Sequence, residues 1–210
     1  MGYILIHGLG QNSSGWDKTI SYLGEKFRAD CPDVTQLLSD KEPTYSNLYL
    51  AFSEYCREYE DPVCLCGLSL GAILALNYAL DHPEKVQSLI LIGAQYRIPK
   101  VLLGIQNAIF RFLHESSFRN FGFNKNSFIQ LSKSFISLDF SNRIADIGCK
   151  TLVLCGEKDK ANKKASHELA GYIKEAEFRI VKGAGHEVNT DAPETLAYII
   201  NEFWGEKQSG

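Results

Sequence analysis

The segment Gly67-Leu68-Ser69-Leu70-Gly71 decides the fold of this chain. A serine with a glycine two residues away on each side, placed between a strand and a helix, is the pattern of a nucleophile elbow. The turn is so tight that Gly67 and Gly71 must be small, and it exposes the Ser69 hydroxyl at the end of the sheet. The backbone N–H of Leu70, at the start of the helix, can then face a developing oxyanion.

The surroundings of this segment give it its value, because the pattern alone arises by chance about 0.07 times in a chain of this length. The run Pro62–Cys66 before it is apolar and has the length of a buried strand. The run Ala72–Ala79 after it has the composition of a helix. Ser69 is therefore a candidate nucleophile.

The whole chain has the composition of an ordinary globular protein. Its 210 residues are 45% hydrophobic and 22% charged, with a net charge of −3. This length suits one domain, which we place over residues 1–210. The chain has no basic tract, so we expect no nucleic-acid partner.

The N-terminal sequence and the cysteines predict a cytoplasmic protein. The segment Met1–Gly8 lacks the features of a targeting segment, and no run is apolar for long enough to span a membrane. Cys64, Cys66 and Cys155 lie in strand-like runs, where a free cysteine behaves as a small hydrophobic residue. Cys64 and Cys66 are too close for the usual zinc knuckle, so we expect reduced thiols and no metal.

Short apolar runs alternate with longer amphipathic runs, which is typical of a parallel sheet with helices on both faces. The expected strands are Tyr3–Ile6, Val34–Leu38, Val63–Cys66, Val86–Ile92, Thr151–Cys155 and Glu177–Val181. The expected helices are Gly15–Phe27, Ser46–Tyr59, Leu70–Asp81, Lys163–Ile173 and Pro193–Trp204.

Residues 96–147 break this alternation and predict an insertion that sits on the sheet. Two helices fit it, Val101–Glu115 and Lys125–Ser137, and it holds eight of the 12 phenylalanines. Its seven basic and three acidic residues indicate either a solvated helical face or a bias toward anionic substrates or acyl carriers.

His186 is the candidate general base. A serine hydroxyl is a poor nucleophile at neutral pH and needs a base beside it. His186 lies in a glycine-rich loop between the last expected strand and the last expected helix. The ordinary alternative is a surface histidine, but the serine elbow upstream favours a catalytic role. The remaining histidines are His7, His82, His114 and His167.

The base in turn needs a carboxylate to orient it. Asp159 follows the expected strand Thr151–Cys155, three residues beyond Gly156. Glu157 is a rival in the same turn, and loop carboxylates are more often solvated than catalytic. The position after the strand favours Asp159.

A second oxyanion donor is expected in the turn after the first strand. Leu9 N–H is the natural candidate, since Gly8 allows close backbone approach. Ser13 stands where a dinucleotide fingerprint needs its third glycine, and Trp16 stands where a P-loop needs lysine. We therefore expect no phosphate cradle and no cofactor.

Together these motifs resemble the α/β-hydrolase superfamily, specifically its small carboxylesterase and lipase-like members, over essentially the whole chain. The order serine, acid, histidine along the chain is also that of the superfamily. The resemblance implies that Ser69 is the nucleophile, Asp159 the orienting acid and His186 the base and then the acid. It also implies that Leu9 and Leu70 supply the oxyanion N–H groups. The matching segments are His7–Gly10 with Trp16, Gly67–Gly71, Gly156–Asp159 and Gly185-His186.

The resemblance further implies a three-layer fold with a six-stranded, mostly parallel sheet and a small helical cap. The family usually has eight strands, and this chain starts at what would be the third. We therefore expect the spatial order 4-3-5-6-7-8 in the family's count, without the antiparallel edge. The insertion at about 96–147 matches the family's cap, which shapes the acyl or alcohol pocket.

The function implied is hydrolysis of a carboxylic ester or thioester of a small, mainly apolar molecule through an acyl-enzyme. Serine at position 69 argues against haloalkane dehalogenase and epoxide hydrolase chemistry, which uses an aspartate there in this superfamily. The triad does not separate ester hydrolysis from C–C bond hydrolysis, lyase chemistry or perhydrolysis. A non-catalytic receptor for a small ligand is an alternative of another class, and measured turnover would exclude it.

Overall fold

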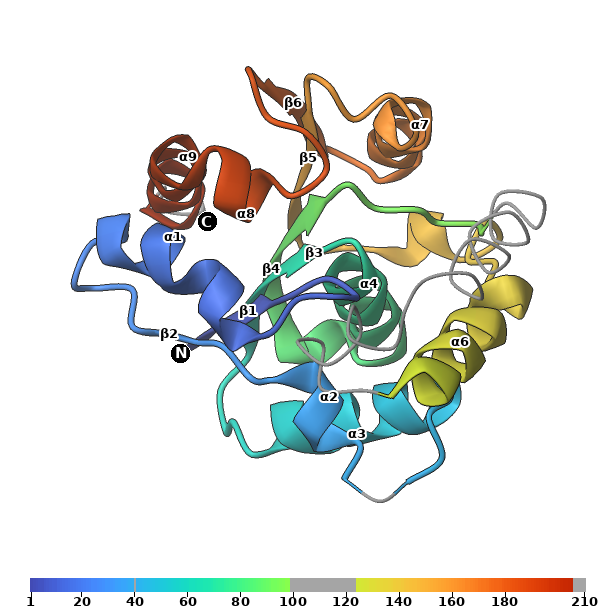
Figure 1. Cartoon of the computed structure of the whole chain (residues 1–210). Coiled ribbons are helices and arrows are strands. Elements are labelled where there is room, and N and C mark those ends of the chain that lie inside the picture. The colour runs from blue at the N-terminus through green and yellow to red at the C-terminus, as the bar shows by residue number, and fades with distance from the viewer. Residues whose placement is uncertain (40, 99–123, 206–210) are drawn as a thin grey trace.

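The fold is built on one parallel sheet, seen in a computed structural model that describes residues 1–39, 41–98 and 124–205 (Figure 1). Within these residues six strands pair in the order β2-β1-β3-β4-β5-β6, and every pairing is parallel. This is the spatial order expected from the sequence. The strands are β1 Gly2–Ile6, β2 Ala29–Asp30, β3 Val63–Leu68, β4 Val86–Ile92, β5 Lys150–Gly156 and β6 Glu177–Val181.

Helices cover both faces of the sheet. In Figure 1, α1, α8 and α9 lie together beside one face, while α3, α4 and α7 lie on the other. None of the described helices is long and apolar enough to cross a membrane. The α-helices are α1 Asp17–Tyr22, α2 Val34–Leu37, α3 Tyr45–Arg57, α4 Leu70–Asp81, α6 Lys125–Ser134, α7 Lys163–Tyr172, α8 Val188–Asp191 and α9 Pro193–Gly205. Short 3₁₀ turns cover Ser13–Trp16, Pro83–Lys85, Phe135–Ser137 and Ile144–Asp146.

Alternate side chains of each strand enter two separate cores. On β1, Ile4 and Ile6 pack with α3 and α4, whereas Leu5 points to the opposite face and packs with α9. All three side chains are fully buried. Strands covered on both faces read as continuous apolar runs, which explains why most strands were predictable from the sequence.

The predicted strand Val34–Leu38 is wrong, because these residues form α2. Asp33 begins the helix, and its Oδ1 accepts a hydrogen bond from the Thr35 N–H at 3.1 Å. Val34 and Leu38, one helical turn apart, are both buried in the core. A short apolar run fits a strand and a buried helix equally well, and the true edge strand is the two-residue β2.

The predicted cap is described only in part. Residues 99–123 lie outside the described residues, and with them the expected helix Val101–Glu115 and five of the eight phenylalanines of the predicted cap. Helix α6 and the 3₁₀ turn after it confirm the expected helix over 125–137. The described phenylalanines, Phe128, Phe135 and Phe140, are all buried packing residues. The basic Arg143 donates hydrogen bonds to Asp81 and to the Leu80 carbonyl, so it fastens this segment to α4.

Helix α4 meets the sheet at a distance that only glycine allows. A Cβ on Gly71 would lie 2.2 Å from the Ile6 carbonyl oxygen, and a Cβ on Gly67 would lie 2.3 Å from the Gly71 carbonyl carbon. Real Cβ atoms essentially never approach within 3.0 Å of another heavy atom. At both positions the added Cβ would clash with backbone atoms, which cannot move aside as the end of a side chain can. Both residues of the elbow must therefore be glycine.

We predict that Gly71→Ala destabilises the fold by about 3 kcal/mol or more, because the added methyl group forces the helix off the sheet. Urea unfolding measures the loss, and a large loss will appear as failure to fold. Gly171→Ala in α7 is the matched control, since nothing lies within 4 Å of its Cβ position. That variant should be neutral or gain up to about 1 kcal/mol from helix propensity. Equal unfolding free energies for the two variants would contradict the prediction.

Candidate active site

Ser69 is the single residue between β3 and α4, and its backbone is strained. Its φ is 53° and its ψ is −111°, a region that a residue with a side chain adopts at a cost of about 1–3 kcal/mol. Its N–H donates to the Ile92 carbonyl at 2.8 Å, and its carbonyl accepts from the Ile73 N–H at 3.0 Å. These two bonds hold the serine between the end of β4 and the first turn of α4.

The turn after β1 lies against Ser69. A Cβ on Gly8 would be 3.4 Å from the Ser69 Cβ. The turn is closed by the Gln11 N–H, which donates to the Gly8 carbonyl at 3.2 Å, and Gly10 takes the positive φ of 88° that it requires. Leu9 is in this turn. Leu70 is the first residue of α4, whose N–H has no partner inside the helix.

His7, at the start of this turn, is fully buried and fixed on both ring nitrogens. Its Nε2 accepts from the Val34 N–H at 3.1 Å, so the proton is assigned to Nδ1, which donates to the Gly8 carbonyl at 2.9 Å. Burial lowers the pKa of His7, against the raising effects of the Gly8 carbonyl and Asp33. The His7 ring is therefore neutral, and its two hydrogen bonds connect the turn after β1 to the start of α2.

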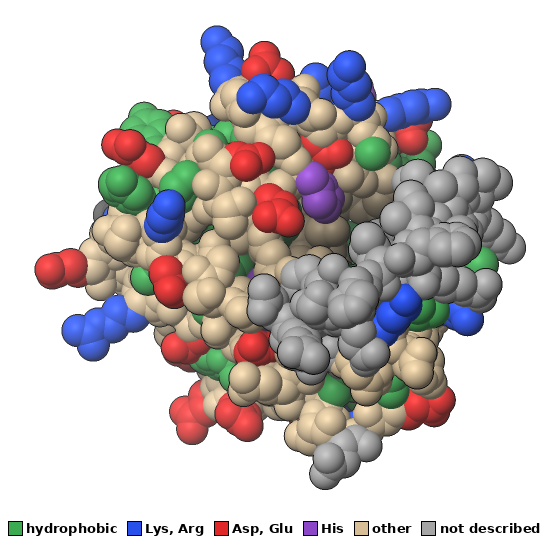
Figure 2. Space-filling view, in the orientation of Figure 1, with side chains coloured by type: hydrophobic (Ala, Val, Ile, Leu, Met, Phe, Trp, Pro, Cys, Tyr) green, Lys and Arg blue, Asp and Glu red, His purple; other side chains and the backbone are tan. Residues whose placement is uncertain are grey.

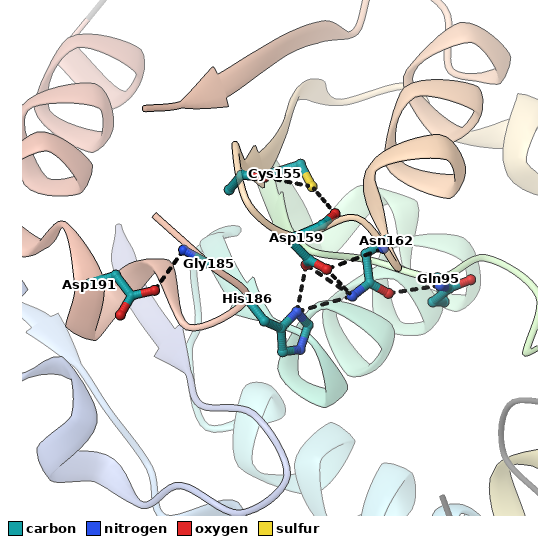
Figure 3. A network of polar contacts seen from close by, with 8 residues as sticks. Gln95, Cys155, Asp159, Asn162, Gly185, His186 and Asp191 are labelled. Atoms are coloured by element: carbon teal, nitrogen blue, oxygen red, sulfur yellow. Dashed lines mark hydrogen bonds and ion pairs between the residues drawn. The ribbon is translucent and has the colours of Figure 1, made fainter. Parts of the chain in front are cut away.

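His186 and Asp159 form a close pair at the ends of β6 and β5. The His186 Nδ1 lies 2.7 Å from the Asp159 Oδ2 (Figure 3). The Asp159 side chain is only 4% exposed, whereas the His186 side chain is 40% exposed. The second ring nitrogen of His186 points away from the carboxylate in Figure 3. A buried carboxylate thus fixes the orientation of the half-exposed His186 ring.

The Asp159 carboxylate stays ionised although it is buried. Burial is the largest effect and raises its pKa, but the hydrogen bonds from His186 and Asn162 together outweigh it, so the pKa is lowered overall. Lysine and arginine side chains gather along the edge over β5, β6 and α7 (Figure 2). Exposed charges of this kind are screened by water, and the direct hydrogen bonds decide the charge state.

The rival acid, Glu157, is bound elsewhere. Its Oε2 accepts from the Gly183 N–H at 2.9 Å, and its own N–H donates to the Val181 carbonyl at 3.0 Å. The next residue, Lys158, donates its N–H to the Ala184 carbonyl at 2.9 Å. Glu157 therefore joins the loop after β5 to the loop before His186.

The loop that carries His186 is also held from its other side. The Gly185 N–H donates to the Asp191 Oδ2 at 2.7 Å (Figure 3). A Cβ on Gly156 would lie 1.9 Å from the Gly185 carbonyl oxygen, so the end of β5 packs directly on this loop. These contacts fix the position of His186 relative to Asp159.

Gly93 connects the serine to the histidine, and sequence reasoning missed it. A Cβ there would lie 3.0 Å from the His186 Cε1 and 3.4 Å from the Asp159 Oδ2, and its φ is +58°. The residue before it, Ile92, is the one whose carbonyl holds the Ser69 N–H. Two consecutive residues therefore contact both parts of the site: Ile92 accepts the Ser69 hydrogen bond, and Gly93 packs against His186. A glycine directly after an apolar strand was the available signal.

Two of the remaining histidines pack against aromatic rings. The His82 ring packs on Tyr78 and the His167 ring packs on Phe178. His114 lies outside the described residues. Across the described part of the chain, no three His, Cys, Asp or Glu side chains are grouped as a metal ion would require.

Several proteins of known sequence resemble part of this chain. A pimeloyl-[acyl-carrier protein] methyl ester esterase from Wigglesworthia glossinidia brevipalpis is 29% identical over 143 residues, which are 65% of this chain and 51% of that protein. A protein of the same name from Aromatoleum aromaticum is 33% identical over 91 residues, 43% of this chain and 36% of the relative. The chain thus spans about half, or less, of the length of these relatives.

The fold matches solved structures along nearly its whole length. An enol-lactonase from Burkholderia xenovorans LB400 superimposes with a TM-score of 0.82 at 18% identity, over 98% of this chain and 92% of the other. At such identity the likeness shows the fold alone. The sequence profile of the α/β hydrolase family matches residues 3–197, a range that contains Ser69, Asp159 and His186. The chain therefore belongs to the α/β hydrolase family.

Proposed function

We propose that this protein is a serine hydrolase that cleaves a carboxylic ester, or a thioester, of a small and mainly apolar substrate. Ser69 is the nucleophile, His186 the general base and then acid, and Asp159 the residue that orients His186. The observation that carries the proposal is the Asp159–His186 pair at 2.7 Å, packed on Gly93 beside the residue that holds Ser69.

The reaction proceeds in two halves through an acyl-enzyme. The Ser69 Oγ attacks the substrate carbonyl carbon while its proton moves to the His186 Nε2. The C–O bond, or C–S bond, to the leaving group then breaks, and the leaving oxygen or sulfur takes that proton from His186. Water, deprotonated by His186, next attacks the acyl carbon and releases the acid with return of the proton to Ser69.

Negative charge develops on the carbonyl oxygen in both tetrahedral intermediates. The N–H groups of Leu9 and Leu70 are the proposed donors to it. Gly8 brings the Leu9 turn within van der Waals reach of Ser69, and Leu70 begins the helix that follows Ser69. Preorganised N–H groups of this kind each contribute about 3–4 kcal/mol of transition-state stabilisation.

The names of the relatives support ester chemistry over C–C chemistry. The two relatives from Wigglesworthia and Aromatoleum are named as methyl ester esterases, and one structural neighbour is described as an enol-lactonase. Each of these names describes cleavage of a carboxylic C–O bond. A screen over esters, thioesters, lactones and C–C substrates therefore should show the highest kcat/KM among the esters.

We predict that Ser69→Ala lowers ester hydrolysis by at least about 10³-fold, because no other group supplies the nucleophile. The measurements are the rate on a short p-nitrophenyl ester and labelling by a fluorophosphonate probe. Ser21→Ala, at an exposed position on α1, is the control and should keep both. Unchanged labelling of the Ser69→Ala protein would sink the mechanism.

The two carboxylates of the β5 turn give a second prediction. Asp159→Asn should lower kcat by about 10⁴-fold, because the amide favours the wrong tautomer of His186. Glu157→Gln should leave kcat within about threefold, since a glutamine oxygen can still accept from the Gly183 N–H. Steady-state rates of the two variants decide the matter, and a larger loss for Glu157→Gln would assign the acid to Glu157.

A further inference from the structure

The amide of Asn162 lies at the centre of the polar network around Asp159 (Figure 3). Its Nδ2 is 2.9 Å from both Asp159 carboxylate oxygens and 3.1 Å from the His186 Nδ1. Its backbone N–H donates to the Asp159 Oδ1 at 3.2 Å. Asn162 therefore supplies two donors to the carboxylate that faces His186.

Asn162 occupies a helix N-cap without serving as one. It precedes α7, where asparagine is favoured because its side-chain oxygen accepts a backbone N–H of the first turn. In this helix the cap side chain makes no such bond. By contrast, Thr44 caps α3 in the usual way, accepting from the Asn47 N–H at 3.3 Å. The side chain of Asn162 instead forms its hydrogen bonds with Asp159.

Gln95 sets which end of the Asn162 amide faces Asp159. Its Nε2 donates to the Asn162 Oδ1 at 2.7 Å. The acceptor end of the amide is thereby occupied, and the donor end must turn to the carboxylate. Gln95 follows β4, whereas Asp159 and Asn162 follow β5, so this bond also ties two strand ends together.

We propose that Asn162, oriented by Gln95, is a positioning residue that holds the Asp159 carboxylate in place for His186. A carboxylate accepts about four hydrogen bonds, and His186 fills only one of these places. The donors from Asn162 prevent the carboxylate from rotating and keep its Oδ2 on the His186 Nδ1. The effect on turnover rests on the proposed function, but the effect on the His186–Asp159 bond does not.

The primary test compares Asn162→Ala with Asn162→Ser, which retains one donor. Asn162→Ala should lower kcat about 10- to 100-fold, the loss expected for one hydrogen bond to a charged group. KM should stay within about twofold, because Asn162 acts through Asp159 rather than on the substrate. Asn162→Ser should recover part of the loss. Thr44→Ala is the control for lost capping, and it should lower the melting temperature without changing kcat.

A second variant tests the orienting role of Gln95. Gln95→Glu replaces the donor with an acceptor of the same shape, so the Asn162 amide should flip and present its oxygen to Asp159. This variant should lose at least as much kcat as Asn162→Ala. The double variant should be no worse than the poorer single variant, since both changes remove the same interaction. Additive losses would overturn the role of Gln95.

Proton NMR of the His186 Nδ1–H gives a readout that needs no substrate. In the wild type this proton should resonate far downfield, and Asp159→Asn identifies the signal by removing it. Asn162→Ala and Gln95→Glu should broaden the signal or move it upfield. A signal left unchanged by Asn162→Ala would refute the proposal. A wild type that hydrolyses neither esters nor thioesters would refute the proposed function, while this spectrum would still decide the role of Asn162.

Discussion

Helix α4 packs so closely against the Ile6 carbonyl that no side chain fits at Gly71. This contact fixes where the helix begins and therefore where Ser69 lies. The chain must turn from β3 into α4 within one residue, which forces Ser69 to a positive φ. The strain is about 1–3 kcal/mol. Full burial of one leucine or isoleucine contributes about as much, and α4 buries every residue from Leu70 to Leu80. The free energy gained by burying the residues of α4 therefore exceeds the conformational cost at Ser69 several times over.

The Asp159–His186 pair is held by a different kind of force, hydrogen bonds between loops. Parallel strands bring the ends of β5 and β6 to the same edge of the sheet. The Gly183 N–H donates to the Glu157 carboxylate and the Lys158 N–H to the Ala184 carbonyl, and these two bonds join the loops. Burial alone would favour protonation of Asp159, but its hydrogen bonds reverse that preference. The same bonds that place the carboxylate also keep it charged.

Sequence reasoning succeeded where a short window carries a distinctive pattern and failed where it does not. The elbow glycines and the buried strands follow from spacing and from the close approach of backbone to backbone, both of which leave a mark in a short window. The stretch Val34–Leu38 was misassigned because five residues do not distinguish a strand from a helical turn. Asn162 and Gln95 left no mark, because an asparagine before a helix predicts an N-cap. Their partners are set by how the ends of β4 and β5 meet.

The turn after β1 is joined to the loop of His186 by the side-chain amides of Gln11 and Asn189. Asn189, three residues after His186, is fully buried. It donates to the Gln11 Oε1 at 3.1 Å and to the Gly15 carbonyl at 3.0 Å, and it accepts from the Gln11 Nε2 at 3.3 Å. The turn that holds Leu9 therefore moves only if the segment after His186 moves with it. If the Leu9 N–H is the oxyanion donor proposed above, a turn fixed in this way needs no reorganisation as charge develops, and this is the condition under which such a donor stabilises an oxyanion most.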